Sequence, residues 1–176
     1  YEVALAHGVG AVTDVHGGAG EKAAEFFLRC VSVASEKGLS LEDAVLTVMR
    51  EYIRTGRRIE GLGHRVHTHD PRRDVLWEMA EKTGAAGLCV AASRLAEEAL
   101  RDVRGISLPI NVDGVIGAVI ADLGLEPRLA KALFIFGRLM GLSAHYFEEV
   151  ATQPPMRAIN FGEAVYRGVP DRSYPD

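Results

Sequence analysis

The chain has 176 residues, enough for one domain with a sizeable core or for two small ones. Hydrophobic residues make up 48% of it and charged residues 25%, as in an ordinary folded soluble protein, and no apolar stretch approaches the ~20 residues of a membrane span. The net charge of −4 gives no electrostatic reason to expect binding to nucleic acid or to an acidic membrane surface.

Helical periodicity dominates the sequence, and several predicted helices have a recognisable first or last residue. Ser40 followed by Asp43 resembles a capping box at a helix start. Pro71 stands at a first helical position and Gly84 just past a last one, which is the expected asymmetry of helix ends. These patterns predict helices over 21–37, 40–56, 71–84, 88–103, 114–124 and about 127–153.

The segments outside these helices show no strand pattern. The apolar piece 106–112 could be extended, but Pro109 cannot donate a ladder hydrogen bond and argues against a central strand. The tail 154–176 is expected to be irregular, and no period-two alternation is long enough for a sheet. The predicted fold class is therefore all-α.

The cysteines indicate a cellular compartment, and the first residue indicates how the sequence relates to a longer chain. Cys30 and Cys89 are far apart and form no CxxC motif, which predicts free thiols in a reducing, cytoplasmic compartment. No signal peptide is visible. The sequence opens at Tyr1, without an initiator Met and within a plausible element, so we expect it to be a piece of a longer chain.

His16 lies in the stretch VHGGAG, directly before a predicted helix. The positive end of the helix dipole disfavours an imidazolium, so this ring should stay neutral and act as a hydrogen-bond donor. A neutral donor suits an oxygen on which negative charge develops during a reaction. Alternatively, His16 helps to cap the helix and the two glycines only make the turn.

The loop GLGHRVHTHDPRR at 61–73 gathers three histidines, an aspartate and three arginines. One interpretation is a metal site made by His64, His67, His69 and Asp70. Neither an H-E-x-x-H motif nor paired cysteines support it, so metal binding is the less favoured interpretation.

The second interpretation of this loop is a turn shaped around an anionic ligand. Gly61 and Gly63 would let backbone N–H groups approach such a ligand closely. The guanidinium groups of Arg65, Arg72 and Arg73 offer paired donors to a carboxylate or a phosphate. A third possibility is that the loop is simply exposed and charged.

Two further charged residues stand beside apolar sequence. Asp113 precedes an apolar helix, and by itself it is most simply a helix cap. Arg138 lies within ALFIFGRLMGLSAHYF, a segment predicted to be largely buried, so its guanidinium needs an anionic partner. That partner is either a carboxylate of the protein or a carboxylate of a substrate.

Five stretches occur together in the order and approximate spacing of a known family: HGGAG around His16, GLGHRVHTHDPR around His64, NVDG around Asp113, the helix around Arg138, and PMRAINF around Arg157. Over nearly the entire chain they resemble the C-terminal part of the citrate synthase superfamily. The forms 111-NVDGVIG-117 and 136-FGRLMGLSAHY-146 are more similar to citryl-CoA lyases, including the corresponding module of ATP-citrate lyase. Citrate synthases usually show NVDxxSG at the first of these places.

The resemblance implies a role for each matching residue. His16 would hydrogen-bond the thioester oxygen and stabilise the enol, Asp113 would exchange a proton with the acetyl methyl group, and His64 would bind the hydroxyl or carbonyl oxygen of the substrate. The substrate carboxylates would be held by three arginines: Arg72, Arg138 and, contributed by a partner subunit, Arg157. Coenzyme A would lie against the backbone of Ile59, Gly61, Leu62 and Gly63, together with Asn111.

This chemistry sets a requirement on Asp113. Forming or breaking a carbon–carbon bond next to a thioester needs a base for the carbon acid and a donor where enolate charge gathers. The pKa of an ordinary aspartate is near ~3.9, so Asp113 would need desolvation to become a stronger base. The positive end of a nearby helix would instead lower this pKa.

The resemblance also implies a citrate-synthase-like helical fold, with 18–112 as the small domain, 1–17 and 113–176 as part of the large domain, and a homodimer. The implied reaction is cleavage of citryl-CoA to acetyl-CoA and oxaloacetate, or the reverse condensation, with a coenzyme A thioester as substrate and no permanently bound cofactor or metal. A citrate or 2-methylcitrate synthase is the first alternative. The family also has a substrate-binding histidine upstream of HGGAG that these residues do not include, so a non-catalytic coenzyme A or citrate-binding module is another alternative.

Overall fold

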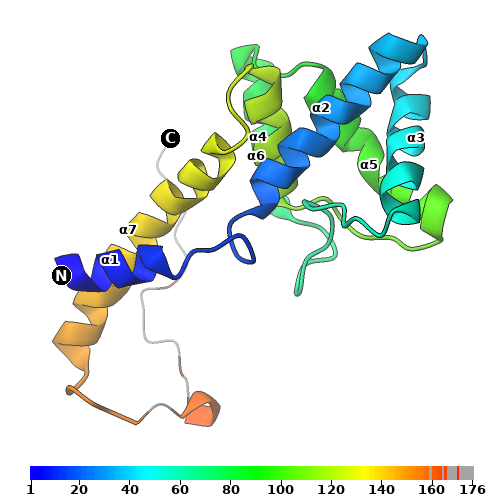
Figure 1. Ribbon diagram of the computed structural model, residues 1–176. Coiled ribbons are helices and arrows are strands. Elements are labelled where there is room, and N and C mark those ends of the chain that lie inside the picture. Colours follow the sequence, from blue (N-terminus) through cyan, green and yellow to red (C-terminus); the bar gives the residue numbers. More distant parts are fainter. Residues whose placement is uncertain (159, 164, 166–169, 171–176) are drawn as a thin grey trace.

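The computed structural model describes residues 1–158, 160–163, 165 and 170, and its regular elements are all helices (Figure 1). In chain order they are α1 (Glu2–Gly10), α2 (Ala19–Lys37), α3 (Leu41–Arg54), α4 (Pro71–Thr83), α5 (Leu88–Arg104), α6 (Val112–Asp122), α7 (Leu129–Thr152) and the short 3-10 helix η1 (Phe161–Glu163). The all-α prediction is confirmed, and the six predicted helices match α2 to α7 to within two residues at each end. None of the helices in the described ranges is both long and apolar enough to cross a bilayer.

Two helices that are far apart in the sequence cross in close contact at the centre of the fold. A Cβ atom added to Gly117 of α6 would lie 2.5 Å from the carbonyl oxygen of Gly20 and 2.7 Å from the backbone nitrogen of Ala24, both in α2. A residue without a side chain is therefore needed for this approach. A Cβ on Gly20 would in turn lie 3.5 Å from the carbonyl oxygen of Asp113. The crossing thus places the first turn of α6 beside the start of α2.

A continuous apolar core lies between α2, α3, α5 and α6. Its largest fully buried side chains include Phe26, Phe27 and Met49, and the two free thiols, Cys30 and Cys89, are buried in it as well. Burying large apolar side chains of this kind stabilises a fold by roughly 1.5–3 kcal/mol each. The core is therefore the rigid support from which the connecting loops extend.

Polar side chains tie the outer helices to this core. The first N–H groups of a helix need partners from outside it. Asp122, at the end of α6, supplies them for α5 by accepting hydrogen bonds from the backbone N–H groups of Gly87, Cys89 and Val90. On α4, the indole N–H of buried Trp77 donates to Oγ of Ser93 in α5 at 3.0 Å. These bonds fix α4 and α5 relative to α6.

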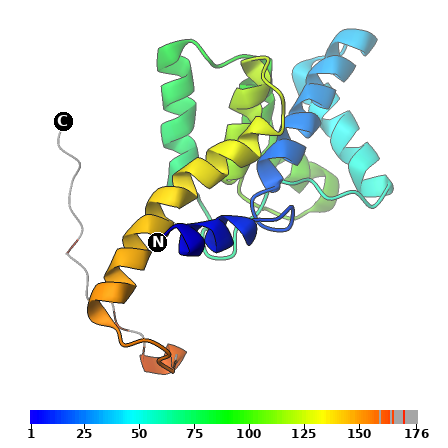
Figure 2. The same ribbon diagram turned by 60° about the vertical axis from the view of Figure 1, so that its left-hand side comes forward.

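Helix α7 starts at the bundle and runs away from it, and α1 lies against its middle (Figures 1 and 2). The two helices meet where Gly8 of α1 faces Leu142 of α7; a Cβ on this glycine would lie 2.9 Å from the leucine side chain. Helix α1 was not predicted, because the apolar residues of EVALAHGVG are spread around the helix and mark no single face.

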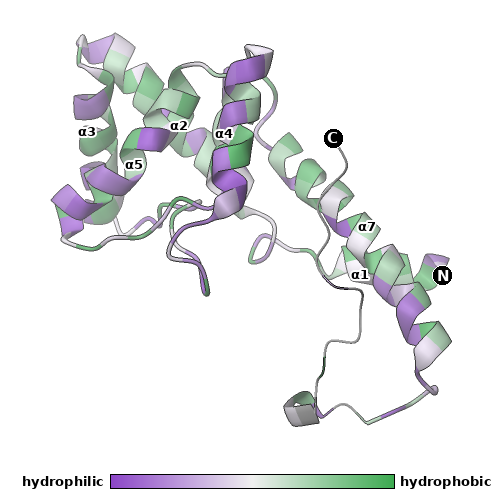
Figure 3. Ribbon diagram, turned by 180° about the vertical axis from the view of Figure 1, so that it is seen from behind, coloured by the Kyte–Doolittle hydropathy of each residue, from purple (hydrophilic) through white to green (hydrophobic). Residues whose placement is uncertain are grey.

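The prediction that the segment around Arg138 is largely buried is wrong for the described residues. Arg138 is exposed, Phe136 is 62% exposed and Met140 is 71% exposed, and only Ala130 of α7 is buried. The apolar residues along α7 in Figure 3 therefore lie on a helix that the described part of the chain leaves largely uncovered. The physical reason is that α7 projects beyond the bundle, whereas the sequence pattern predicted packing along its whole length.

The segments outside the helices hold little regular structure. The piece 106–112, which could have been extended, contributes only an isolated antiparallel bridge between Leu62 and Ile110. Among the described residues of the tail, η1 is the only helix. The division into a small domain at 18–112 and large-domain segments at 1–17 and 113–176 stays a prediction.

Candidate active site

Asp113 lies in the first turn of α6 and is half-buried. The cap of this helix is Asn111, whose side-chain oxygen accepts a hydrogen bond from the N–H of Gly114 at 3.1 Å. The simple interpretation of Asp113 as the cap is therefore wrong, because the helix has already begun at Val112. No group in the described part of the chain hydrogen-bonds the Asp113 carboxylate, so its oxygens remain available.

The surroundings of Asp113 shift its proton affinity. Burial raises the pKa of this carboxyl above that of an ordinary aspartate, and the nearby side chains of Arg72, His16 and His64 act in the opposite direction. A raised pKa makes the carboxylate a stronger base, which is the direction that proton exchange with a carbon acid requires. Side chains from the segment before α2, from the loop before α4 and from α4 itself are thus near enough to Asp113 to act on its charge.

His16 lies in the turn before α2, with its side chain exposed. The cap position of α2 is Gly18 and no side chain caps this helix, so the alternative in which His16 is a capping residue is not realised. The ring of His16 packs against the ring of Phe134 in α7, with centroids 5.3 Å apart and an interplanar angle of 87°. The guanidinium of Arg138 lies over the same Phe134 ring, 5.1 Å from its centroid. Phe134 therefore places Arg138 on the His16 side of the site.

His64 and Arg72 form a second pair of donors. The Nδ1 atom of His64 accepts hydrogen bonds from the backbone N–H groups of Val66 and His67, at 3.1 and 2.9 Å. The ring proton of His64 is therefore on Nε2, which lies 3.5 Å from Nη2 of Arg72. Since both atoms are donors, only an acceptor such as a carboxylate or hydroxyl oxygen can satisfy them together.

Backbone hydrogen bonds pin the loop before α4 to the segment before α6. The N–H of Asn111 donates to the carbonyl oxygen of Gly61 at 2.9 Å, and the N–H of Gly63 donates to that of Pro109 at 2.7 Å. The N–H of Gly63 is thus not available to a ligand, contrary to the expectation from the glycine spacing. Gly61 has a φ of +85°, and a Cβ there would lie 2.6 Å from the Cα of Gly114. Glycine is therefore required here by close backbone packing.

A groove of about 400 Å³ lies beside this loop. Ile59 and Leu62, two of the residues expected at coenzyme A, line it, and so do the guanidinium-bearing side chains of Arg57, Arg58 and Arg104. Apolar walls with several guanidinium groups suit an elongated ligand that has an apolar arm and phosphates. Sequence reasoning missed these arginines, although the Arg57-Arg58 pair, two residues before the glycine loop, was a usable signal.

The histidines and the aspartate of the loop do not converge as metal ligands would. The Nε2 atom of His69 pairs with the carboxylate of Asp74, and its Nδ1 atom accepts a hydrogen bond from Arg73 at 2.9 Å. Asp70 is buried and bonded to Arg72. Within the described ranges, no three or more His, Cys, Asp or Glu side chains are grouped so that they could hold a metal ion.

The other arginines of the predicted site differ in what they contact. Arg73 is 12% exposed and pairs with Glu97, so it is not offered to a ligand as the sequence had suggested. Arg138 forms no ion pair with any residue that the structure describes. Arg157 makes two hydrogen bonds of 2.8 Å to Glu149, near the end of α7 that lies away from the bundle (Figures 1 and 2). Its role in a partner subunit's site stays a prediction.

Comparison with known proteins gives a family that agrees with this arrangement. The sequence model for "Citrate synthase, C-terminal domain" matches residues 2–159. The chain belongs to this family. Among solved structures, it is similar to citryl-CoA lyase from Hydrogenobacter thermophilus, with a TM-score of 0.75 and 36% identity over 99% of this chain and 66% of that one. The predicted resemblance to citrate synthases and citryl-CoA lyases is confirmed.

Two longer relatives extend the comparison. Citrate synthase from Corynebacterium glutamicum is 32% identical over 174 residues, which cover 94% of this chain and 38% of that enzyme. ATP citrate lyase from Methanothrix soehngenii, solved in complex with citrate and coenzyme A, has a TM-score of 0.65 and 26% identity, over 93% of this chain and 28% of that one. The chain thus spans about two fifths of the length of the Corynebacterium enzyme.

Proposed function

We propose that this chain carries an active site that cleaves citryl-CoA to acetyl-CoA and oxaloacetate, or that catalyses the reverse condensation. Asp113 carries the proposal: its carboxylate is half-buried, has no hydrogen-bond partner in the described residues, and has a pKa that burial raises. These are the properties of a base for a carbon acid. The family of the chain and its similarity to citryl-CoA lyase support the same type of reaction.

In the condensation direction, Asp113 removes a proton from the methyl group of acetyl-CoA. A ring N–H of His16 donates to the thioester oxygen, on which the enolate charge gathers. The enol carbon then attacks the carbonyl carbon of oxaloacetate. The resulting alkoxide accepts a hydrogen bond from Nε2–H of His64 and takes up a proton, supplied by solvent through this ring, to become a hydroxyl. In the cleavage direction the hydroxyl gives up its proton by the same route as the carbon–carbon bond breaks, and protonated Asp113 returns its proton to the methyl carbon.

The substrate's anionic groups have separate places in this proposal. Arg72 and Arg138 would hold carboxylates of oxaloacetate, and Arg157 of a second copy would complete the set, which makes the assembly a homodimer. Coenzyme A would lie in the groove lined by Ile59 and Leu62, with its phosphates near the three arginines of that groove and the backbone of Gly61, Gly63 and Asn111 beside it. The reaction needs no permanently bound cofactor or metal.

A citrate synthase or 2-methylcitrate synthase is the second candidate, and the identity of 32% to the Corynebacterium citrate synthase favours it. A non-catalytic module that binds coenzyme A or citrate is a third. It would use the same groove and the same arginines, but it would not need a base. The two enzymes therefore differ from the module in what Asp113 does.

The deciding experiment follows deuterium exchange at the methyl group of acetyl-CoA by NMR, with and without oxaloacetate. The wild-type chain should exchange these protons. Asp113→Asn should exchange them at least about 100-fold more slowly, because the amide keeps the shape of the side chain but cannot act as a base. Its affinity for coenzyme A, measured by calorimetry, should stay within about twofold of wild type.

The other outcomes separate the candidates. Coenzyme A binding without any methyl exchange in wild type would identify a non-catalytic module. Exchange that persists in Asp113→Asn would remove this residue from the chemistry, and absence of both binding and exchange would refute the proposed function. Rates of citryl-CoA cleavage and of citrate formation, measured on the same protein, distinguish a lyase from a synthase.

A further inference from the structure

Asp70 is the only fully buried charged side chain among the described residues. It stands at the cap position of α4, where its carboxylate accepts a hydrogen bond from the N–H of Arg72 at 3.1 Å. Capping alone does not require a charge or burial, since serine and asparagine cap helices equally well. Three further donors converge on the same carboxylate, and none of them takes part in capping α4.

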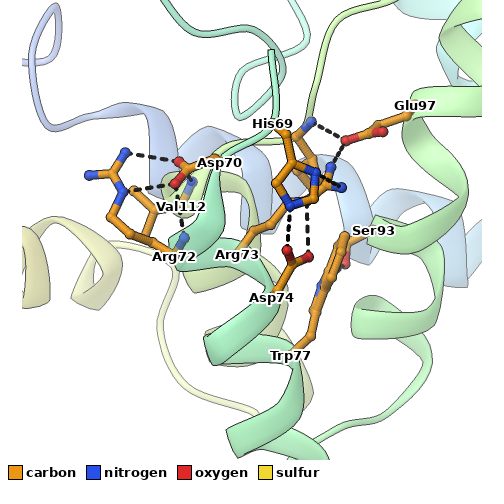
Figure 4. A network of polar contacts seen from close by, with 10 residues as sticks. His69, Asp70, Arg72, Arg73, Asp74, Trp77, Ser93, Glu97 and Val112 are labelled. Atoms are coloured by element: carbon orange, nitrogen blue, oxygen red, sulfur yellow. Dashed lines mark hydrogen bonds and ion pairs between the residues drawn. The ribbon is translucent and has the colours of Figure 1, made fainter. Parts of the chain in front are cut away.

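Two of these donors belong to the side chain of Arg72. Its Nε atom donates to Oδ1 of Asp70 at 2.9 Å and its Nη2 atom to Oδ2 at 2.8 Å (Figure 4). Two parallel bonds fix the plane of a guanidinium. Nη1 and one hydrogen of Nη2 take no part in this pairing, and the Arg72 side chain is 54% exposed. Asp70 thus fixes the cation while leaving one edge of it open to a ligand.

The remaining donor is the N–H of Val112, 2.9 Å from Oδ2 of Asp70. Val112 is the first residue of α6, so its N–H needs a partner from outside the helix. The next residue is Asp113. One buried carboxylate therefore joins the start of α4, which carries Arg72, to the start of α6, which carries the base (Figure 4).

We propose that Asp70 is a positioning residue that holds the guanidinium of Arg72 and the first turn of α6, with Asp113 on it, at a fixed separation before any ligand binds. The inference rests on the proposed function, because it gives Arg72 a substrate carboxylate to bind. A preformed separation between a carboxylate-binding group and a base avoids the ordering that would otherwise weaken binding and slow the reaction.

The charges around the base agree with this role. Burial is the main influence on the pKa of Asp113. Arg72 lowers this pKa, and Asp70 offsets part of that effect by raising it. A cation that is needed for the substrate can therefore lie near the base without fully cancelling the effect of burial. Asp70 supplies this offset from a position that makes no contact with solvent.

Asp74 offers a matched control on the same helix (Figure 4). It lies in the first turn of α4, its side chain is 47% exposed, and it pairs with His69 and Arg73. Asp74→Asn removes the same charge from the same end of α4 as Asp70→Asn does. It leaves the bonds of Arg72 and Val112 in place.

The test measures oxaloacetate and citrate binding to wild type, Asp70→Asn and Asp74→Asn by calorimetry. Asparagine at position 70 keeps one oxygen, which can still accept from the backbone N–H and the Nε–H of Arg72, but its amide nitrogen cannot accept from Nη2 of Arg72 or from the N–H of Val112. Its oxaloacetate affinity should fall at least about tenfold, whereas Asp74→Asn should bind within about twofold of wild type.

A double variant separates positioning from general destabilisation. In an Arg72→Met background, Asp70→Asn should cause little further loss of affinity, because the two residues act on the ligand as one unit. Wild-type affinity in Asp70→Asn, or losses that add fully in the double variant, would overturn the proposal and leave Asp70 as a cap. The asparagine amide could disturb folding, because its N–H would face the N–H of Val112. Asp70→Ser avoids this, since serine caps a helix equally well and has no amide N–H; the same loss of oxaloacetate affinity is expected.

An NMR measurement keeps the proposal distinct from the proposed function. Failure of wild type to bind oxaloacetate or citrate would refute that function, but amide exchange would still report on Asp70. The N–H of Val112, which loses its acceptor, should exchange with solvent at least about tenfold faster in Asp70→Asn and at the wild-type rate in Asp74→Asn. Unchanged exchange in Asp70→Asn would overturn the inference.

Discussion

Gly61→Ala should destabilise the protein for two separable reasons. Gly61 has a φ of +85°, and a left-handed backbone costs a residue with a Cβ about 1–2 kcal/mol. The new Cβ would also lie 2.6 Å from Cα and 3.1 Å from N of Gly114. These are backbone atoms in α6 that cannot rotate away, so the loop and the helix must separate, at about 1–3 kcal/mol if the cost is that of an overpacked core.

Gly38 provides the matched control. It ends α2 with a φ of +61°, and a Cβ there would meet no atom within 4 Å. Gly38→Ala should therefore cost only the conformational part, about 1–2 kcal/mol. At about 3 °C per kcal/mol for a chain of this size, central values of about 3.5 and 1.5 kcal/mol predict melting temperatures about 10 °C and about 5 °C below wild type.

Thermal unfolding followed by far-ultraviolet circular dichroism measures both losses, and calorimetry measures ligand binding by the same proteins. Displacement of the loop would break the hydrogen bond from Asn111 to Gly61, so oxaloacetate and coenzyme A affinity should fall in Gly61→Ala but not in Gly38→Ala. Equal melting temperatures for the two variants would refute the close contact between Gly61 and Gly114. The distance between the loop and α6 would then not be set by this contact.

Three further predictions follow from single residues. Arg138→Met should leave the free energy of unfolding within about 0.5 kcal/mol of wild type, because no described carboxylate pairs with it, and it should reduce the rise in melting temperature that oxaloacetate causes. Burial acts to raise the pKa of Asp70, but its bonds to Arg72 and Val112 hold it at about 2, below the ordinary 3.8. A folded-state pKa that is lowered stabilises the protein above the unfolded value, so acid titration should show about 2 kcal/mol of stability lost as the pH falls from about 4 to about 2. Burial raises the pKa of the Cys30 and Cys89 thiols to about 12, so a thiol reagent should label them only as fast as the protein unfolds.

Each of these predictions has its own contrary result. A large loss of melting temperature in Arg138→Met without ligand, with an unchanged oxaloacetate effect, would show that Arg138 belongs to a structural ion pair. An Asp70→Asn protein with the same acid denaturation as wild type would contradict the low pKa of Asp70. Labelling of either cysteine at the rate of an exposed thiol would contradict their burial.

The helix boundaries could be predicted because the signals that set them are local. Ser40 accepts a hydrogen bond from the N–H of Asp43 at 3.1 Å, as the capping pattern indicated. Gly84 ends α4 with a φ of +73°, and Pro71 begins it. Such features depend on residues a few positions apart, so the sequence contains all the information they need.

The features that assemble the site depend on distant residues and could not be predicted in this way. Gly20 and Gly117 are recognisable as a packing pair only once α2 and α6 are known to cross. Asp70 and Val112 are 42 residues apart. They meet because that crossing, and the backbone hydrogen bonds between the loop before α4 and the segment before α6, bring α4 to α6. The exposure of α7 is also a tertiary property, because an apolar pattern shows that a helix has a face to cover and not what covers it.

The two aspartates of the site differ in the hydrogen bonds that their carboxylates accept, although their residue type is the same. Asp70 and Asp113 are both acidic residues beside a helix start, and the sequence made the first a possible metal ligand and the second a helix cap. In the structure the carboxylate of Asp70 accepts from four donors, so it has little capacity left for a metal or a proton. The carboxylate of Asp113 accepts from none in the described residues, and burial raises its pKa. In these proposals, therefore, the holding role belongs to the aspartate whose hydrogen bonds are complete and the role of base to the one whose oxygens are open.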